Sequence, residues 1–164
     1  MKIIIDADAC PVTDIAVKIA KEKKIQCLII CDNAHKIMRD EVETIVVSQG
    51  ADAVDFAIIS KTDKKDIIVT QDYGLASIIL SKEAYAINQD GLIYNKFNIE
   101  SLLFSRHMSQ KMRNAGKRTK GPKKRTMNQN KDFEKNLIKL LEDINSLIKE
   151  EEWILINVKT VEMN

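Results

Sequence analysis

Short, wholly apolar segments that alternate with helix-like segments constrain the fold of this chain most. Residues 3–5 are three consecutive Ile, and residues 67–69 are Ile-Ile-Val. Strands without polar alternation are typical of parallel sheets that are covered on both faces. The periodicity predicts strands at 2–6, 25–31, 44–48, 66–70 and 84–87, and helices at 11–24, 53–60 and 75–81. This alternation predicts an α/β fold, with a parallel sheet, helices on both faces and right-handed crossovers.

The chain changes character after the Asp90-Gly91 turn signal. Two further helices are predicted, at 99–112 and at 131–149, and the second is strongly amphipathic. Between them, residues 114–130 are basic and polar and are expected to form a mobile loop. Residues 153–161 are β-prone without an evident partner, and we expect them either to pack on the body or to mediate self-association as a homodimer. The chain therefore divides into one domain over 1–150 and a C-terminal extension over 151–164.

Acidic residues follow the predicted strands. Asp6 and Asp8 come after the first strand and Asp72 after the fourth, while Asp55 lies in the helix after the third. Ligands of open parallel sheets bind beyond the carboxyl ends of the strands. Carboxylates gathered there repel one another unless a divalent cation or protons compensate them. These four residues are therefore predicted to bind a metal such as Mg²⁺ and to be catalytic, acting on a phosphoryl group.

Three motifs resemble the YaiI/YqxD family of uncharacterised bacterial proteins. They are Asp-Ala-Asp-Ala-Cys-Pro at 6–11, Ile-Val-Thr-Gln-Asp at 68–72 with Leu-Ala at 75–76, and Gly-Pro at 121–122 followed by Asp-Phe at 132–133. The resemblance covers residues 1 to about 145. That family is assigned to the PIN-like superfamily, whose nucleases use clustered acids and Mg²⁺ or Mn²⁺ to cleave RNA or DNA. The resemblance thus implies a PIN-like three-layer α/β/α sandwich with C-terminal helices, and a metal-dependent nuclease.

The resemblance also assigns roles to individual acids. Asp6 matches the first carboxylate of the PIN-like site, Asp55 the helix-borne acid and Asp72 the acid after the fourth strand. Asp8 is an extra carboxylate within the family's own motif, and Asp90 falls where PIN nucleases often have a further acid.

Two supporting residues are expected near these acids. Thr70 would orient Asp72 or contact a phosphate. His35 follows the second strand and is either a proton shuttle or an ordinary loop residue.

A basic stretch covers residues 101–131, with ten Lys and Arg and no Asp or Glu. Of the 26 Lys and Arg in the chain, 16 remain elsewhere against 24 Asp and Glu, so the rest of the protein is acidic. Such a block favours a polyanionic partner, because binding phosphates releases condensed counterions. We expect the partner to be nucleic acid, RNA more than DNA, whose phosphate backbone contacts the cationic side chains of this stretch. These are Arg106, Lys111, Arg113, Lys117, Arg118, Lys120, Lys123, Lys124 and Arg125.

Simpler structural roles compete with these assignments. Asp8 and Asp72 could cap the helices that follow them, and Asp55 could be a capping or exposed residue. The acids could also belong to a non-catalytic RNA-binding protein. An apolar-Asp-x-Asp strand is found in haloacid-dehalogenase-like phosphatases too, but Cys10 stands where a Thr or Val is usual, and no downstream acidic pair with a lysine is evident.

The composition predicts a cytoplasmic protein. No apolar run approaches the roughly 20 residues that a membrane helix needs, and no signal peptide is evident. The three cysteines, Cys10, Cys27 and Cys31, form no paired motif and are expected to be reduced and buried.

Overall fold

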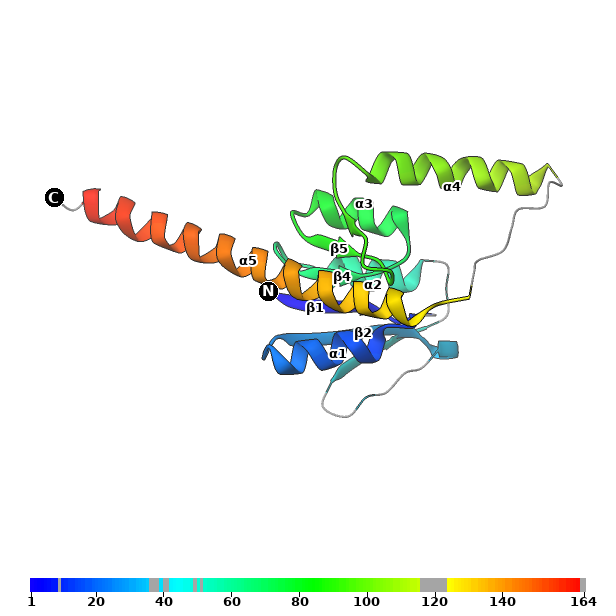
Figure 1. Ribbon diagram of the computed structural model, residues 1–164, viewed down its shortest axis with the longest axis horizontal. Helices are drawn as coiled ribbons and strands as arrows, with labels where there is room; N and C mark the ends of the chain where they lie inside the picture. The colour runs from blue at the N-terminus through cyan, green and yellow to red at the C-terminus, as the bar shows by residue number, and fades with distance from the viewer. Residues whose placement is uncertain are drawn as a thin grey trace.

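The computed structural model describes residues 1–8, 10–35, 39, 42–48, 50, 52–115 and 124–162. Its centre is a six-stranded sheet in the order β3-β2-β1-β4-β5-β6. The strands are β1 Lys2–Asp6, β2 Gln26–Asp32, β3 Glu43–Val47, β4 Ile67–Val69, β5 Tyr85–Ile87 and β6 Ile93–Tyr94. Helices cover both faces of the sheet, as Figure 1 shows, so the predicted three-layer α/β arrangement is confirmed.

The first five strands are mutually parallel, as expected, but the sheet has an antiparallel edge. β6 pairs antiparallel with β5 through Ala86–Tyr94 and Ile87–Ile93. The predicted parallel strands are thus confirmed, and β6 is an additional edge strand that the sequence analysis did not include. A strand of two residues is too short to leave a periodic pattern in the sequence.

The two faces of the sheet form two separate cores. Ile3 and Ile5 of β1 face α1 (Thr13–Glu22) and α5 (Met127–Glu162). Ile4 faces α2 (Ala53–Lys61), α3 (Tyr73–Ser81) and the first turn of α4 (Ile99–Asn114). All three Ile are fully buried, because a strand turns successive side chains to opposite faces and both faces are covered. This explains the unbroken apolar run near the start of the chain.

The C-terminal segment differs most from expectation. Residues 153–161 are helical, not β, because α5 is one helix of 36 residues that runs without a break past position 150. Extending an existing helix adds a hydrogen bond for each residue fixed, so the β preference of Trp, Ile and Val is overridden. Of the expected loop at 114–130, α4 includes Asn114 and α5 begins at Met127, while 116–123 lie outside the described residues.

The topology places a crevice at the carboxyl ends of β1 and β4. These strands are neighbours, and the chain leaves β1 toward β2 on one side but reaches β5 from β4 on the other. Ligands of such sheets bind where the strand order reverses in this way. In the described parts of the chain, no helix has both the length and the apolarity needed to cross a bilayer.

Candidate functional site

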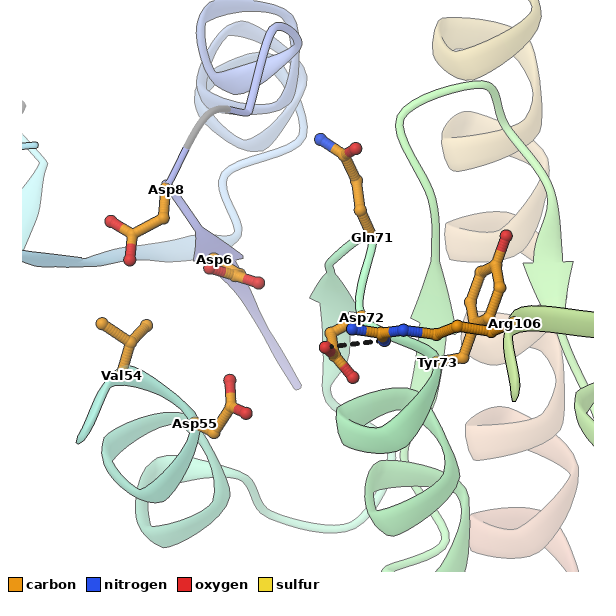
Figure 2. A pocket seen from close by; sticks show the side chains of 8 residues that line it. All are labelled: Asp6, Asp8, Val54, Asp55, Gln71, Asp72, Tyr73 and Arg106. Carbon is orange, nitrogen blue, oxygen red and sulfur yellow. Dashed lines mark hydrogen bonds and ion pairs between the residues drawn. The ribbon is translucent and has the colours of Figure 1, made fainter. Parts of the chain in front are cut away.

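A pocket of about 500 Å³ opens at this reversal point. Figure 2 shows carboxylates from three directions around it: Asp6 ends β1 and Asp8 follows it, Asp55 comes from the first turn of α2, and Asp72 precedes α3. The structure thus brings all four predicted acids to one pocket. The remaining lining residues are Val54, Gln71, Tyr73 and Arg106.

Asp6 is held in place by a buried threonine. The Thr70 hydroxyl donates a hydrogen bond to Asp6 Oδ2 at 2.6 Å and accepts one from the Asp72 backbone N–H at 3.1 Å. Thr70 is only 2% exposed, so this hydroxyl has no free access to solvent. It therefore fixes the side chain of Asp6 and the backbone of Asp72 together, and the expected link between Thr70 and Asp72 is a backbone contact.

Asp72 has two sets of partners. Its Oδ1 accepts the backbone N–H groups of Gly74 at 2.7 Å and Leu75 at 3.0 Å, which makes it the N-cap of α3. Its Oδ2 accepts a hydrogen bond from Nη1 of Arg106, which lies on α4, at 2.9 Å. Asp72 is therefore both a helix cap and a wall of the pocket, so the structural and the functional reading are compatible.

Asp8 and Asp55 approach the pocket from β1 and from α2. Asp8 Oδ1 accepts the backbone N–H of Asp32 at 3.3 Å. Helix α1 begins only at Thr13, with Val12 as its N-cap residue, so Asp8 does not occupy the cap position. Asp55 is half-buried within the first turn of α2, where a negative charge is favoured by the helix dipole.

The charges of these carboxylates influence one another. Burial raises the pKa of Asp6 to about 6, against the effect of the Thr70 hydrogen bond, and the negative charges of Asp55 and Asp8 add to the rise. The pKa of Asp55 is also raised, first by burial and then by Asp72 and Asp52. Burial acts to raise the pKa of Asp72, but the Leu75 N–H and Arg106 outweigh it, so that pKa is lowered. The pocket therefore concentrates negative charge, which Arg106 offsets most at Asp72 and in part at Asp55.

The donor chemistry of this pocket suits a hard divalent cation, but the carboxylates do not converge into a closed cage. Among the described residues, no group of three or more His, Cys, Asp or Glu is placed so as to hold a metal ion. Mg²⁺ usually keeps several waters and takes only one or two protein carboxylates, with substrate phosphates as further ligands. An open, partly hydrated site is therefore the arrangement that these residues fit.

The predicted nucleic-acid-binding cations have different surroundings. Arg106 reaches the pocket, and Lys111 and Arg113 lie exposed on the second half of α4. Lys124 is exposed just before α5. The predicted contacts Lys117, Arg118, Lys120 and Lys123 lie outside the described residues.

Arg125 is engaged within the protein. It donates from Nε to Asn130 Oδ1 at 2.8 Å and from Nη1 to Asp90 Oδ1 at 2.7 Å. Its Nη2 also donates to the Gln89 carbonyl at 2.5 Å. Asp90, the position suggested for a further acid, thus belongs to a bond network between the β5–β6 turn and α5. It does not line the acidic pocket.

The cysteines do not line the pocket, and the role predicted for His35 lies outside the described residues. His35 ends a short 3₁₀ helix, η1 (Asn33–His35), after β2, and its side chain lies outside the described part of the structure. The three cysteines are free, and only Cys31 is fully buried. Burial raises the pKa of the Cys10 thiol, which fits a packing role.

Sequence reasoning missed three lining residues and the position of Arg106. Gln71 and Tyr73 are adjacent in sequence to Asp72, a predicted site residue, and this adjacency could have indicated them. Val54 directly precedes Asp55. No sequence signal indicates that Arg106, 34 residues after Asp72, forms an ion pair with it at 2.9 Å.

The chain has many relatives of similar length. Residues 4–143 match the model of the uncharacterised YaiI/YqxD family. A UPF0178 protein of Exiguobacterium sibiricum is 46% identical over 141 residues, which cover 86% of this chain and 96% of the relative. A UPF0178 protein of Clostridium kluyveri is 42% identical over 153 residues, which cover 93% of this chain and all of the relative. No solved structure matches the chain. The protein belongs to the YaiI/YqxD family, as its three motifs indicated.

Proposed function

We propose that this protein is a divalent-metal-dependent nuclease that hydrolyses phosphodiester bonds in RNA, or less readily in DNA. The observation that carries the proposal is the gathering of Asp6, Asp8, Asp55 and Asp72 around one pocket with Arg106 at its wall. A pocket of only carboxylates would repel a phosphate. Carboxylates together with an arginine suit a phosphate that arrives with a cation.

The carboxylates would hold Mg²⁺ or Mn²⁺ in a partly hydrated site. Asp6 and Asp55 are the first choice for ligands, because burial and neighbouring carboxylates raise the pKa of both and neither forms an ion pair with a described residue. Asp8 and Asp72 stand beside them, and Thr70 keeps Asp6 aimed into the pocket. A divalent cation bound there supplies Lewis-acid polarisation of a phosphoryl oxygen and of an attacking water.

The basic face of α4 would position the nucleic acid. The Arg106 guanidinium is planar and matches the geometry of a phosphate, to which it can donate two parallel hydrogen bonds. Arg113 lies seven residues further along α4 and thus on the same face of the helix. These contacts are to phosphates, so they favour little sequence specificity.

A cleavage assay with labelled single-stranded RNA tests the proposal. We expect cleavage in Mn²⁺ or Mg²⁺, none in EDTA, and a loss of at least about 100-fold in Asp6→Asn and Asp55→Asn. The matched control is Asp52→Asn, which removes the same charge from an exposed residue three positions from Asp55. Asp52 has φ 62°, a conformation that Asn adopts readily, so we expect this control to keep its fold and its cleavage rate. Folded wild-type protein that leaves RNA intact in both metals, or Asp6→Asn that cleaves normally, would contradict the proposal.

One observation favours a second candidate, a non-catalytic RNA-binding protein. Asp72 is already neutralised by Arg106 and used as the cap of α3, so one of the four carboxylates is committed without a metal. In this case RNA binding would persist unchanged in EDTA and in Asp6→Asn, with no cleavage. The same preparations therefore distinguish the two functions.

A further inference from the structure

The second half of α4 and the C-terminal end of α5 lie at opposite ends of the molecule (Figure 1), and both carry exposed apolar side chains. The outer α4 stripe consists of Phe104, Met108 and Met112, whose exposed fractions are 66%, 41% and 45%. The tail stripe on α5 consists of Leu147, Ile154, Leu155 and Val158, which are 46%, 54%, 61% and 51% exposed. Contiguous apolar side chains at this level of exposure are typical of interaction sites.

The tail stripe is a continuation of the protein core. Leu140, Leu147 and Ile154 follow one another at intervals of seven residues, which keeps them on one side of α5. Leu140 is only 5% exposed because it packs on the sheet, whereas the later positions extend past it. An ion pair between Glu151 and Lys65 is formed at the edge of the body. Residues 152–162 of α5 then project past the body for about 16 Å. They lie outside the family match, which ends at residue 143.

The outer α4 stripe lies on the side of its helix away from the body. Phe104, Met108 and Met112 recur every four residues, so they form a row along α4. The opposite side is anchored by Ile99, 7% exposed, and carries Arg106 toward the pocket. The two sides of α4 are therefore available for two different tasks.

The two stripes have complementary charges beside them. Glu150 and Glu152 flank the tail stripe, one on each side. Lys111 and His107 lie beside the outer α4 stripe, and residues 101–114 contain no Asp or Glu. Opposite charges at the edges of two apolar surfaces favour their association and its register.

We propose that the tail stripe of one chain packs on the outer α4 stripe of a second copy, and the reverse, in a two-fold symmetric dimer. A chain cannot make this contact with itself, because the two stripes lie at opposite ends (Figure 1). With two reciprocal contacts, each chain offers seven large apolar side chains and their neighbours. A standard interface buries roughly 800 Å² on each partner, which favours a contact that uses both stripes of each chain over one that uses a single stripe. In a two-fold dimer each surface is used once on each chain, so the assembly closes.

Pairing of two tails with each other explains less. Glu151 lies seven residues after Ile144 and seven before Val158, so it would face the seam of such a helix pair. It would place two carboxylates in that seam, and it would leave the outer α4 stripe exposed. In the reciprocal contact Glu151 faces α4 instead, which carries no Asp or Glu over 101–114, and both stripes are covered.

Analytical ultracentrifugation of the full chain tests the dimer. We expect wild type to sediment at about 37 kDa, twice 18.7 kDa. The tail variant Ile154→Glu/Leu155→Glu and the α4 variant Met108→Glu/Met112→Glu should each weaken the dimer by roughly 30-fold or more. The control, Phe56→Glu/Ile78→Glu, removes two exposed apolar side chains from α2 and α3 and should remain a dimer. All the substituted residues are exposed, and circular dichroism checks that each variant is folded.

Mixing the two disrupted variants gives the decisive result. A tail variant and an α4 variant together retain one intact tail–α4 contact, so the mixture should form a heterodimer that neither variant forms alone. Wild type that is still monomeric at about 100 μM, a concentration at which only a dimer weaker than about −5.5 kcal/mol would stay dissociated, would overturn the dimer. An α4 variant that dimerises like wild type would overturn the tail–α4 contact and indicate tail–tail pairing. Dimerisation is independent of RNA cleavage, so either can fail without the other.

Discussion

At the scale of single residues, the pocket combines burial that destabilises a charged carboxylate with hydrogen bonds that stabilise it. The half-buried Asp6 carboxylate has a pKa of about 6 instead of 3.8, so its charged form is disfavoured in the folded protein. Folded enzymes commonly tolerate such groups where they are needed for function. The burial of Asp6 is thus a better sign of function than its acidic type alone.

Replacement of Asp6 should stabilise the metal-free protein at neutral pH. The folded state binds a proton on Asp6 more tightly than the unfolded state, so wild-type stability falls as the pH rises from about 4 to 6. Asp6→Asn removes this charge while keeping an acceptor for Thr70. We expect its free energy of unfolding at pH 7.5 in EDTA to exceed that of wild type by about 2–3 kcal/mol, and the gain to vanish near pH 4. Urea unfolding measures both, with the exposed Asp143→Asn as control; an Asp6→Asn variant less stable than wild type at pH 7.5 would refute the charge cost.

The Thr70 hydroxyl should matter more than the volume of its side chain. Thr70→Val leaves the Asp6 carboxylate without its donor and the Asp72 N–H without its acceptor. We expect a loss of about 1–3 kcal/mol in urea unfolding, because buried polar groups would lose their partners. Thr70→Ser keeps the hydroxyl and should recover most of the loss. Equal losses in the two variants would show that packing, and not the hydrogen bonds, decides stability here.

At the scale of elements, the docking of α5 depends on a tight approach to the β5–β6 turn. Gly91 has φ +85°, and a Cβ there would lie 2.7 Å from the Asp132 carbonyl oxygen. Asn136 Nδ2 donates to the Gly91 carbonyl at 2.9 Å, and Arg125 binds the same turn through Asp90. This turn therefore fixes the start of the helix that covers one face of the sheet.

Gly91→Ala should be strongly destabilising. The added methyl group combines an unfavourable backbone conformation with a clash against backbone atoms, so we expect a loss of about 2–4 kcal/mol in urea unfolding. Gly50→Ala is the control, because a Cβ at Gly50 would lie 3.7 Å from Ala53 Cβ, an ordinary contact. That variant should stay within about 1 kcal/mol of wild type. A Gly91→Ala protein as stable as Gly50→Ala would show that the turn yields to the new side chain.

The elements also show how far the sequence alone leads. The apolar runs of β1 and β4 and the acids after them were readable, because strand position and strand direction follow from local pattern. The edge strand β6 could not be predicted, because two residues are too few to show a periodic pattern of apolar and polar side chains. The helical state of residues 153–161 was missed because local β preference opposes it, while the preceding helix decides it. The Arg106–Asp72 ion pair depends on how α4 docks, which no local pattern records.

At the scale of the whole molecule, charge is divided between an acidic body and a basic stretch. The ten Lys and Arg of residues 101–131 face no acid within that stretch, but the structure gives Arg106 and Arg125 internal partners. The number of Lys and Arg in this stretch therefore overstates the number of phosphate contacts. Of the described cations, Arg113 and Lys124 are the exposed ones best suited to bind phosphate outside the dimer contact.

RNA affinity should decrease steeply with salt, and these two cations should account for part of that slope. Each phosphate contact on single-stranded RNA contributes about 0.7 to the slope of log K against log salt. We expect Arg113→Gln/Lys124→Gln to reduce the slope by about 1.4 in fluorescence anisotropy titrations. Lys18→Gln/Lys23→Gln removes two charges, one from the middle of α1 and one from its C-cap. Both are remote in sequence from the basic stretch, so this variant should leave the slope unchanged. A reduction of the same size in both variants would show that net charge, and not a local contact, governs binding.

The most direct measurement is a crystal structure of the protein soaked with Mn²⁺, read by its anomalous signal. We expect one peak within coordinating distance of the Asp6 carboxylate and of at least one of Asp55, Asp8 and Asp72. The peak should be absent from Asp6→Asn crystals and present in Asp52→Asn crystals. A peak at none of these carboxylates, in crystals with an open pocket, would contradict the metal site on which the proposed nuclease depends.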